Sequence, residues 1–342
     1  MPRKHNRAPP ELFADPFRER VDRVWERLQL LGARFEFQSN SRRLMDLVHS
    51  AYAGLPPHRL SGSTPLLRVA LLLTSRPGPH PRSEPPRLEM FSGAAFLAGA
   101  TAGSSFVAVS PQERSALVAV APRMLRFPYH TRYELLEFAV FTLAARVQGL
   151  VPLHAACVGR SGRGVLLMGP SGSGKSTVAL QCLLDGLDFV SEDSVFVAPE
   201  TMLATGVANF LHVPSEALRW ISRASRAAAI RRSPIIRRRS GVRKFELDLR
   251  RGGYRLAPAP LQIGAVVFLS AHSAGARPLL TRLPRSRWRA ELVAAQAYAA
   301  QQAQWGQFTQ RVSRLEVFEL RRGRHPQDSV DALRKLLDSP SR

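Results

Sequence analysis

The sequence predicts an α/β protein in two parts, a smaller α+β region over residues 1–149 and an α/β domain over 150–338. Two observations lead to this prediction. Short apolar runs alternate with stretches of helical periodicity along the chain, which is typical of mixed α/β folds. Near residue 150 the pattern changes to strand, glycine-rich turn, strand and helix in close succession, which indicates a second unit.

The composition is that of a globular protein. The chain has 342 residues, of which 45% are apolar and 22% charged, so collagen-like, low-complexity and wholly disordered classes are excluded. The formal net charge is +23, and nearly all of the excess is arginine. Such a surplus indicates an anionic partner, but arginine with few lysines also reflects GC-rich codon usage. Charge alone therefore does not select a partner.

The sequence favours a cytoplasmic protein. Two cysteines, Cys157 and Cys182, are too few for a disulfide framework. The first residues are polar and lead to Pro9-Pro10 without an apolar leader segment. The most apolar long stretch, 135–150, is interrupted by charged residues and is shorter than the ~20 residues that a bilayer span needs. We expect no membrane association.

In the first region, apolar spacing and turn residues predict seven segments after a polar tail over 1–16. The expected segments are a helix from Phe17 to Leu31, a strand over 35–37, a helix from Ser41 to Gly54, a strand over 66–74, a proline-rich loop over 76–86, an antiparallel meander over 91–120 and a helix over 133–148.

In the second region, short apolar runs predict strands around a glycine-rich loop. The expected segments are strands over 154–158 and 165–168 joined by a tight turn, a loop over 169–177, a helix to about 184, strands over 187–190, 195–197 and 263–269, a helix over 288–305, a strand over 315–320 and a helix over 328–337.

The glycine-rich loop matches the complete pattern G-x-x-x-x-G-K-[ST] and stands between an apolar strand and a helix. In this pattern backbone N–H groups and the helix N-terminus surround a nucleotide phosphate, the lysine reaches the outer phosphates and the hydroxyl binds Mg²⁺. An ordinary Gly/Ser turn is the alternative. The predicted phosphate-binding residues are Gly169, Pro170, Ser171, Gly172, Ser173, Gly174, Lys175, Ser176 and Thr177.

Glu192 and Asp193 follow the next predicted strand, at the edge where α/β sheets place their sites. Two adjacent carboxylates allow one to bind Mg²⁺ and the other to accept a proton from a hydroxyl nucleophile. We assign Glu192 as the base and Asp193, with Ser176, to the metal; a solvated acidic turn is the alternative. His154 begins the strand predicted to run antiparallel to the one that enters the loop, so we expect it near the start of the loop.

These segments, from Leu153-His154-Ala155-Ala156 through the loop to Ser191-Glu192-Asp193, resemble the catalytic domain of HPr kinase/phosphorylase. The resemblance is close over 150–200 and faint to about 335, and residues 1–149 resemble only the variable front halves of diverged relatives such as lasso-peptide kinases. It implies a P-loop domain with a mixed sheet of the HPr kinase/PEP carboxykinase type, with His154 near the transferred phosphate and Lys175 and Ser176 at the phosphates and Mg²⁺.

The chain departs from that family in two places. The first acid is Glu192 where the family has Asp, and the stretch L-E-I-R-G-L-G that follows the acidic pair in the family is missing. Ala204 to Asn209 stand nearby instead. These departures count against HPr as the substrate and against a reverse phosphorylase reaction.

Nine basic residues gather over 221–244. They form either a solvated arginine-rich loop or an electrostatic cradle for an acidic peptide or for phosphates. No aromatic residues are interleaved in a nucleic-acid-binding pattern, which disfavours nucleic acid as the partner. The members are Arg223, Arg226, Arg231, Arg232, Arg237, Arg238, Arg239, Arg243 and Lys244.

The sequence thus predicts a kinase that uses ATP and Mg²⁺ to phosphorylate a serine of a protein or peptide acceptor. Two alternatives remain open, a small-metabolite kinase of the same fold and a nucleotide-binding regulatory protein without catalysis. The second carboxylate and the nearby histidine favour an enzyme. The acceptor, the oligomeric state and the role of residues 1–149 are left undetermined.

Overall fold

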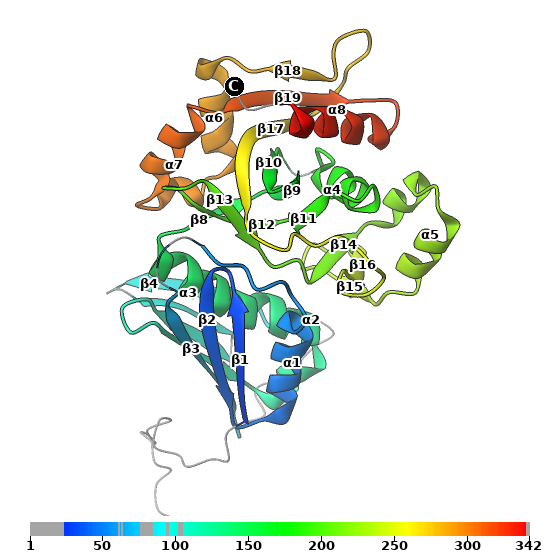
Figure 1. Ribbon diagram of the computed structural model, residues 1–342. Coiled ribbons are helices and arrows are strands. Elements are labelled where there is room, and N and C mark those ends of the chain that lie inside the picture. The colour runs from blue at the N-terminus through cyan, green and yellow to red at the C-terminus, as the bar shows by residue number, and fades with distance from the viewer. Residues whose placement is uncertain are drawn as a thin grey trace, which may run out of the picture.

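The computed structural model describes residues 24–339 except 61, 63, 76–84, 94–95, 102–104 and 171. The fold is mixed α/β, with two large mixed sheets and one small antiparallel sheet (Figure 1). The expected polar tail over 1–16 and most of the proline-rich loop lie outside the described residues.

The first sheet has seven strands in the order β1-β2-β3-β7-β6-β5-β4. The β2–β3 and β3–β7 pairs are parallel, whereas β4 to β7 form the antiparallel meander expected from the sequence. The strands are β1 (Val24–Leu30), β2 (Ala33–Ser39), β3 (Leu66–Leu73), β4 (Leu88–Gly93), β5 (Phe96–Thr101), β6 (Phe106–Ser110) and β7 (Ser115–Val120).

Two helices cover this sheet. The helix α1 (Arg42–Tyr52) packs against β1 to β3, and α3 (Glu137–Gln148) packs against β3, β6 and β7. Both helices were expected. The chain enters α3 through α2 (Pro128–His130) and a π-helical segment over Thr131–Leu136. Gly149 ends α3 in the left-handed conformation, as glycine does at many helix C-termini.

The helix predicted from Phe17 to Leu31 is wrong over residues 24–30, which form a strand. Residues 24–30 form β1, which pairs along its length with β2, and residues 17–23 lie outside the described part. Val24 and Leu28 are four residues apart, a spacing that places two side chains on one side of a strand as well as of a helix. Pairing with β2 therefore decides the conformation, and Trp25 remains 54% exposed.

The second sheet has nine strands, with the path β11-β9-β10-β17-β13-β12-β8 and with β19 between β17 and β18. The central pairs β10–β17 and β17–β19 are parallel. Its strands are β8 (Val151–His154), β9 (Ala156–Arg160), β10 (Arg163–Met168), β11 (Asp188–Ser191), β12 (Ser194–Ala198), β13 (Leu203–Gly206), β17 (Leu261–Ser273), β18 (Leu280–Arg282) and β19 (Glu316–Arg322).

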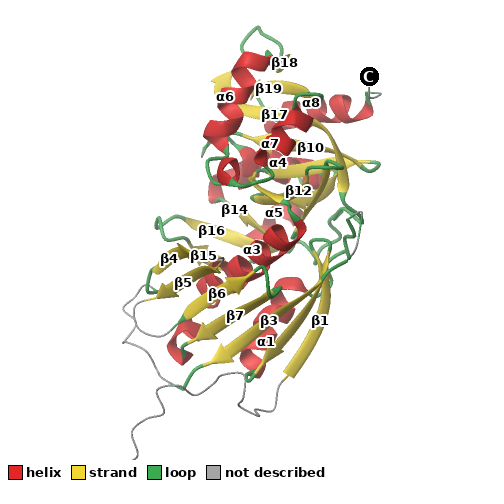
Figure 2. Cartoon of the chain, turned by 90° about the vertical axis from the view of Figure 1, so that its left-hand side faces the viewer, coloured by secondary structure: helices red, strands yellow, loops and turns green. Residues whose placement is uncertain are grey.

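Helices cover both faces of this second sheet (Figure 2). Val165 and Leu167 of β10 join one core with α4 (Lys175–Leu184) and α8 (Pro326–Asp338). Leu166 and Met168 join another core with α6 (Arg285–Ala295) and α7 (Trp305–Val312). Because side chains alternate along a strand, a strand covered on both faces has a continuous run of apolar residues. The strand over 165–168 was predicted from such a run.

Two further predictions in this region are corrected. The expected strand over 154–158 is two strands, β8 and β9, which separate at Ala155 and pair with β12 and β10 respectively. The expected helix over 288–305 is interrupted between α6 and α7. Gln296 is the C-cap residue of α6, and its buried side chain accepts from the backbone N–H of His154 and donates to its C=O.

A small sheet β14-β16-β15 and the helix α5 (Ala224–Arg231) lie beside the nine-stranded sheet. Its strands are β14 (Phe210–Val213), β15 (Ile235–Arg237) and β16 (Arg243–Asp248). Within the described residues no helix has the length and apolar character required to cross a bilayer.

The expected boundary near residue 150 falls between the two large sheets, since β7 ends at Val120 and β8 begins at Val151. The core of the first region also includes Phe196, Ala198 and Val207 of the second. The division into two units, 1–149 and 150–338, stays a prediction.

Candidate active site

The phosphate-type loop connects β10 to α4, as expected. Gly169 has φ +142°, and a Cβ there would approach the carbonyl oxygen of Leu269 to 2.8 Å. Gly174 has φ +101° and directly precedes α4. Glycine is therefore required at both places, by space at the first and by backbone conformation at both. Ser171 lies outside the described residues.

Two cations hold this loop. Lys175, in the first turn of α4, donates its Nζ to the carbonyl oxygen of Gly169 at 2.7 Å. Arg322, at the end of β19, donates its Nη2 to the carbonyl oxygen of Gly172 at 2.8 Å. The Lys175 side chain consequently lies within the loop rather than in solvent. Sequence patterns indicated Lys175 but gave no sign of Arg322.

Glu192 lies buried between β11 and β12, 6% exposed. Its Oε1 accepts a hydrogen bond from the backbone N–H of His212 at 3.0 Å. Its Oε2 is also buried and has no partner among the described residues. A buried carboxylate oxygen without a partner is costly, so this atom is suited to a ligand that the cavity admits.

Asp193 pairs with the histidine singled out from the sequence. His154 Nδ1 lies 2.8 Å from Asp193 Oδ1, and Arg238 Nη2 lies 3.9 Å from Asp193 Oδ2. Burial would raise the pKa of Asp193, but the hydrogen bond from His154 and the charges of His154 and Arg238 outweigh it and lower the pKa to about 2. Asp193 is therefore a carboxylate throughout the neutral range.

His154 reaches this place by a route that the sequence did not indicate. It ends β8, and it lies opposite Ser194 of β12 rather than on the hairpin strand beside β10. The register of β8 against β12 sets His154 next to Asp193. His154 lines the same cavity as the loop.

The loop, Glu192, Asp193 and His154 line one cavity of about 460 Å³. Lys175 and Lys244 face it, and burial lowers the pKa of both ammonium groups. The Asp193 and Glu192 carboxylates act in the opposite direction at both lysines, and Arg238 lowers the pKa of Lys244 further. Partly desolvated cations of this kind favour an anionic ligand.

The cavity fits Mg·ATP in its chemistry. The loop offers backbone N–H groups and Lys175 to phosphates, Ser176 offers a hydroxyl, and Glu192 offers its unpartnered Oε2. Mg²⁺ in nucleotide sites is held by one or two carboxylates together with phosphate oxygens and water. Among the described residues there is no group of three or more His, Cys, Asp or Glu side chains that could hold a metal ion by themselves.

A buried polar chain, absent from the sequence predictions, runs from this cavity into the first region. His212 Nε2 lies 3.3 Å from Glu246 Oε1, and Arg132 donates both Nη groups to the Glu246 carboxylate. Arg132 Nε lies 3.3 Å from Oε1 of Glu137 on α3. These residues are scattered from 132 to 246, so no local pattern could have assembled them.

The arginine-rich segment over 221–244 does not act as one surface. Arg238 faces Asp193, whereas Arg239 donates to Glu134 and to the carbonyl oxygens of Pro85 and Pro86 in the first region. Lys244 lines the phosphate-loop cavity. These three residues therefore divide between the candidate site and the contact with the first region, and an acidic acceptor stays a prediction.

No protein-family model matches the chain, and no curated protein matches it. Among solved structures, the chain is similar to the HPr(Ser) kinase/phosphatase from Coxiella burnetii, with 14% sequence identity and a TM-score of 0.27. The match covers 54% of this chain and 87% of that one. A TM-score this low supports no conclusion about fold or function.

Proposed function

We propose that the protein is an ATP-dependent kinase that transfers the γ-phosphoryl group to a serine of a protein or peptide. The observation on which this rests is the shared cavity, where the complete phosphate loop faces two adjacent carboxylates and a histidine. A protein that only binds nucleotide needs the loop and one metal ligand, not an additional Asp–His pair. The serine and the peptide class are taken from the motif resemblance to HPr kinase/phosphorylase.

Within this proposal, Lys175 and the loop N–H groups bind the phosphates, and Lys175 neutralises charge that develops during transfer. Ser176 would help to hold Mg²⁺, whose charge would stabilise the transferring phosphate. Arg322 keeps the loop in position through Gly172. These groups hold the nucleotide but do not accept a proton from the acceptor.

For the two carboxylates, the geometry favours exchanging the roles assigned from the sequence. Glu192 is the more buried of the two, and its Oε2 has no partner among the described residues, which suits the metal side. Asp193 lines this cavity and also the neighbouring one, so it lies where an acceptor hydroxyl can approach. We therefore place Glu192 on the metal side and Asp193, with His154, on the acceptor side.

In the transfer, the acceptor oxygen forms a bond to the γ-phosphorus as the bond from that phosphorus to the bridging oxygen of ADP breaks. The hydroxyl proton passes to the Asp193–His154 pair. Because phosphoryl transfer has a loose transition state, the pair contributes mainly by orienting the hydroxyl. This role does not require a strong base, so it is compatible with the low pKa of Asp193.

Lys175→Ala tests the proposal, with Lys335→Ala as control because Lys335 is exposed on α8, outside the cavity. Transfer of labelled γ-phosphate from ATP to peptide, and Mg·ATP affinity by calorimetry, are the measurements. We expect Lys175→Ala to lower turnover by roughly 10²–10³ and to weaken nucleotide binding, with an unchanged circular dichroism spectrum. Equal affinity and turnover in both variants would refute nucleotide binding at this loop.

A further inference from the structure

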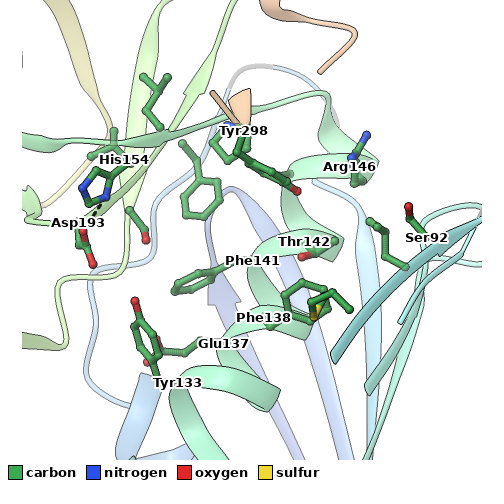
Figure 3. Close-up of a pocket in the computed structure, with 18 of the residues that line it drawn as sticks. Ser92, Tyr133, Glu137, Phe138, Phe141, Thr142, Arg146, His154, Asp193 and Tyr298 are labelled. Carbon is green, nitrogen blue, oxygen red and sulfur yellow. Dashed lines mark ion pairs between the residues drawn. The ribbon is translucent and has the colours of Figure 1, made fainter. Parts of the chain in front are cut away.

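A second cavity, of about 610 Å³, lies between the first region and the nine-stranded sheet (Figure 3). Its walls come from α3, from β4 and β5 of the seven-stranded sheet, and from β8 and β12. Its volume lies within the range of pockets that bury small ligands or a few side chains of a peptide.

This cavity meets the phosphate-loop cavity at two residues. His154 and Asp193 line both, and no other residue that the structure describes is common to the two linings. In Figure 3 the paired His154 and Asp193 stand at one end of the cavity, and Ser92 of β4 stands at the other. A group held in the second cavity therefore adjoins the pair to which we assigned the acceptor hydroxyl.

The lining is mainly apolar. Phe138 and Phe141 project from α3 into the cavity (Figure 3), and Phe196 of β12 packs against Phe141 with ring centroids 5.3 Å apart. Two aromatic side chains of the lining remain largely exposed, Phe91 at 55% and Tyr298 at 56%. Exposed aromatic side chains gathered around one cavity indicate a binding surface rather than ordinary solvent-facing residues.

One side of this cavity offers a free strand edge. Among the described residues β4 pairs only with β5, so its outer edge has backbone groups available for another strand. The edge of β8 is different, because Gln296 already binds both backbone groups of His154. An extended peptide can add to an open edge such as that of β4 while its alternate side chains enter a neighbouring pocket.

The charges around the cavity favour a ligand that carries an acidic group close to its apolar group. Arg146 is exposed at the cavity and forms no ion pair or side-chain hydrogen bond among the described residues. Glu137 also lines the cavity, but its carboxylate already lies 3.3 Å from Arg132 and accepts from Asn209. Among the described lining residues, Arg146 thus presents an uncompensated positive charge.

We propose that the second cavity is the acceptor site and that it binds an extended serine-bearing peptide segment with a large apolar side chain near the serine. The peptide adds along β4, its apolar side chain enters the cavity, and an acidic side chain meets Arg146. This inference rests on the proposed kinase function for the transfer step, but peptide binding in the cavity can be measured without it.

The probes are two sets of synthetic peptides, each peptide with one serine. In the first set phenylalanine stands in turn at each position next to the serine. In the matched set glutamine replaces that phenylalanine. The variants are Phe91→Asp and Tyr298→Asp, with Phe96→Asp as control. Phe96 is 53% exposed on the adjacent strand and does not line the cavity. Binding is followed by fluorescence anisotropy without nucleotide, and transfer by incorporation of labelled phosphate.

We expect at least one phenylalanine peptide to bind, and to be phosphorylated, about tenfold or more better than its glutamine partner. Phe91→Asp and Tyr298→Asp should abolish that preference, and Phe96→Asp should leave it intact. Equal use of both peptide sets, equal behaviour of Phe91→Asp and Phe96→Asp, or no peptide binding would overturn the acceptor site. Phe91-dependent binding without transfer from Mg·ATP to any peptide would instead overturn the kinase function.

Discussion

The two large sheets differ in how they are covered and in what they contribute. Strand β2 of the first sheet alternates buried and partly exposed residues, and helices α1 and α3 share one core with it. Strand β10 of the second sheet is buried along nearly its whole length between two cores. The phosphate loop and the two carboxylates follow strands of the second sheet, whereas the first region contributes aromatic walls.

This difference indicates a division of labour. A sheet covered on both faces holds its strand ends rigidly, so it is suited to groups that must be placed accurately around a reacting phosphate. A sheet with an open edge and exposed aromatic residues is suited to binding a peptide. We propose this division, with chemistry in 150–338 and acceptor binding shared with 1–149.

If the chemistry belongs to the second region, the largest effects should come from its carboxylates. We expect Asp193→Asn to retain Mg·ATP binding and to lose roughly 10²–10⁴ in turnover, because the hydroxyl loses the carboxylate that orients it and accepts its proton. Glu192→Gln should instead weaken nucleotide affinity and raise the Mg²⁺ concentration needed for activity. Calorimetry and steady-state kinetics across Mg²⁺ concentrations measure both effects.

The opposite outcome is informative as well. The assignment made from the sequence alone is correct if Glu192→Gln loses turnover with nucleotide still bound, while Asp193→Asn needs a higher Mg²⁺ concentration for activity. If neither substitution changes transfer, the kinase function fails and a nucleotide-binding regulatory protein is the better description.

The contact between the two regions should matter for stability. Arg132, 6% exposed, joins Glu137 of the first region to Glu246 of the second. We expect Arg132→Ala to lower the free energy of unfolding by about 3–5 kcal/mol, because it leaves two buried carboxylates without their cation. Denaturant titration measures the change. As a control, Arg27→Ala breaks an exposed pair with Glu36 and should cost at most about 1 kcal/mol.

Should Arg132→Ala prove no more damaging than Arg27→Ala, the contact is not a structural link, and the two regions are joined mainly by apolar packing around Phe196. A transition in two steps, rather than one, would show that the two regions unfold separately.

The smallest effect concerns pH. Because the pKa of Asp193 is lowered to about 2 in the folded protein, its ionised form stabilises the fold above its ordinary pKa, and this contribution disappears as the pH falls from about 4 to about 2. Wild type should therefore exceed Asp193→Asn in the free energy of unfolding by at most about 2 kcal/mol above pH 5.

That difference should shrink on acidification, as followed by denaturant titration at a series of pH values. Asp46→Asn is the control, since Asp46 is exposed on α1 and outside every ion pair among the described residues. A difference between wild type and Asp193→Asn that does not change with pH would contradict the ion pair with His154.

Much of the fold could be predicted where the local pattern admits one structure. The loop over 169–177 was recognised because strand, glycines and helix follow directly on one another. The β4–β7 meander and α1 were recognised from local spacing. The part of the expected helix over 24–30 was wrong because a four-residue spacing does not distinguish a strand from a helix, and β2 supplied the missing partner.

By itself the sequence determined the phosphate loop, the carboxylate pair beside it and the mixed α/β character, because each depends on residues that are neighbours in the chain. Only the tertiary structure decided which strand His154 joins, which arginine faces Asp193, and which side chains surround the second cavity. Such contacts join residues that are distant in the chain, up to 114 positions apart for Arg132 and Glu246 and 142 for Gln296 and His154. They form through the packing of sheets and helices as a whole, and no local spacing records that packing.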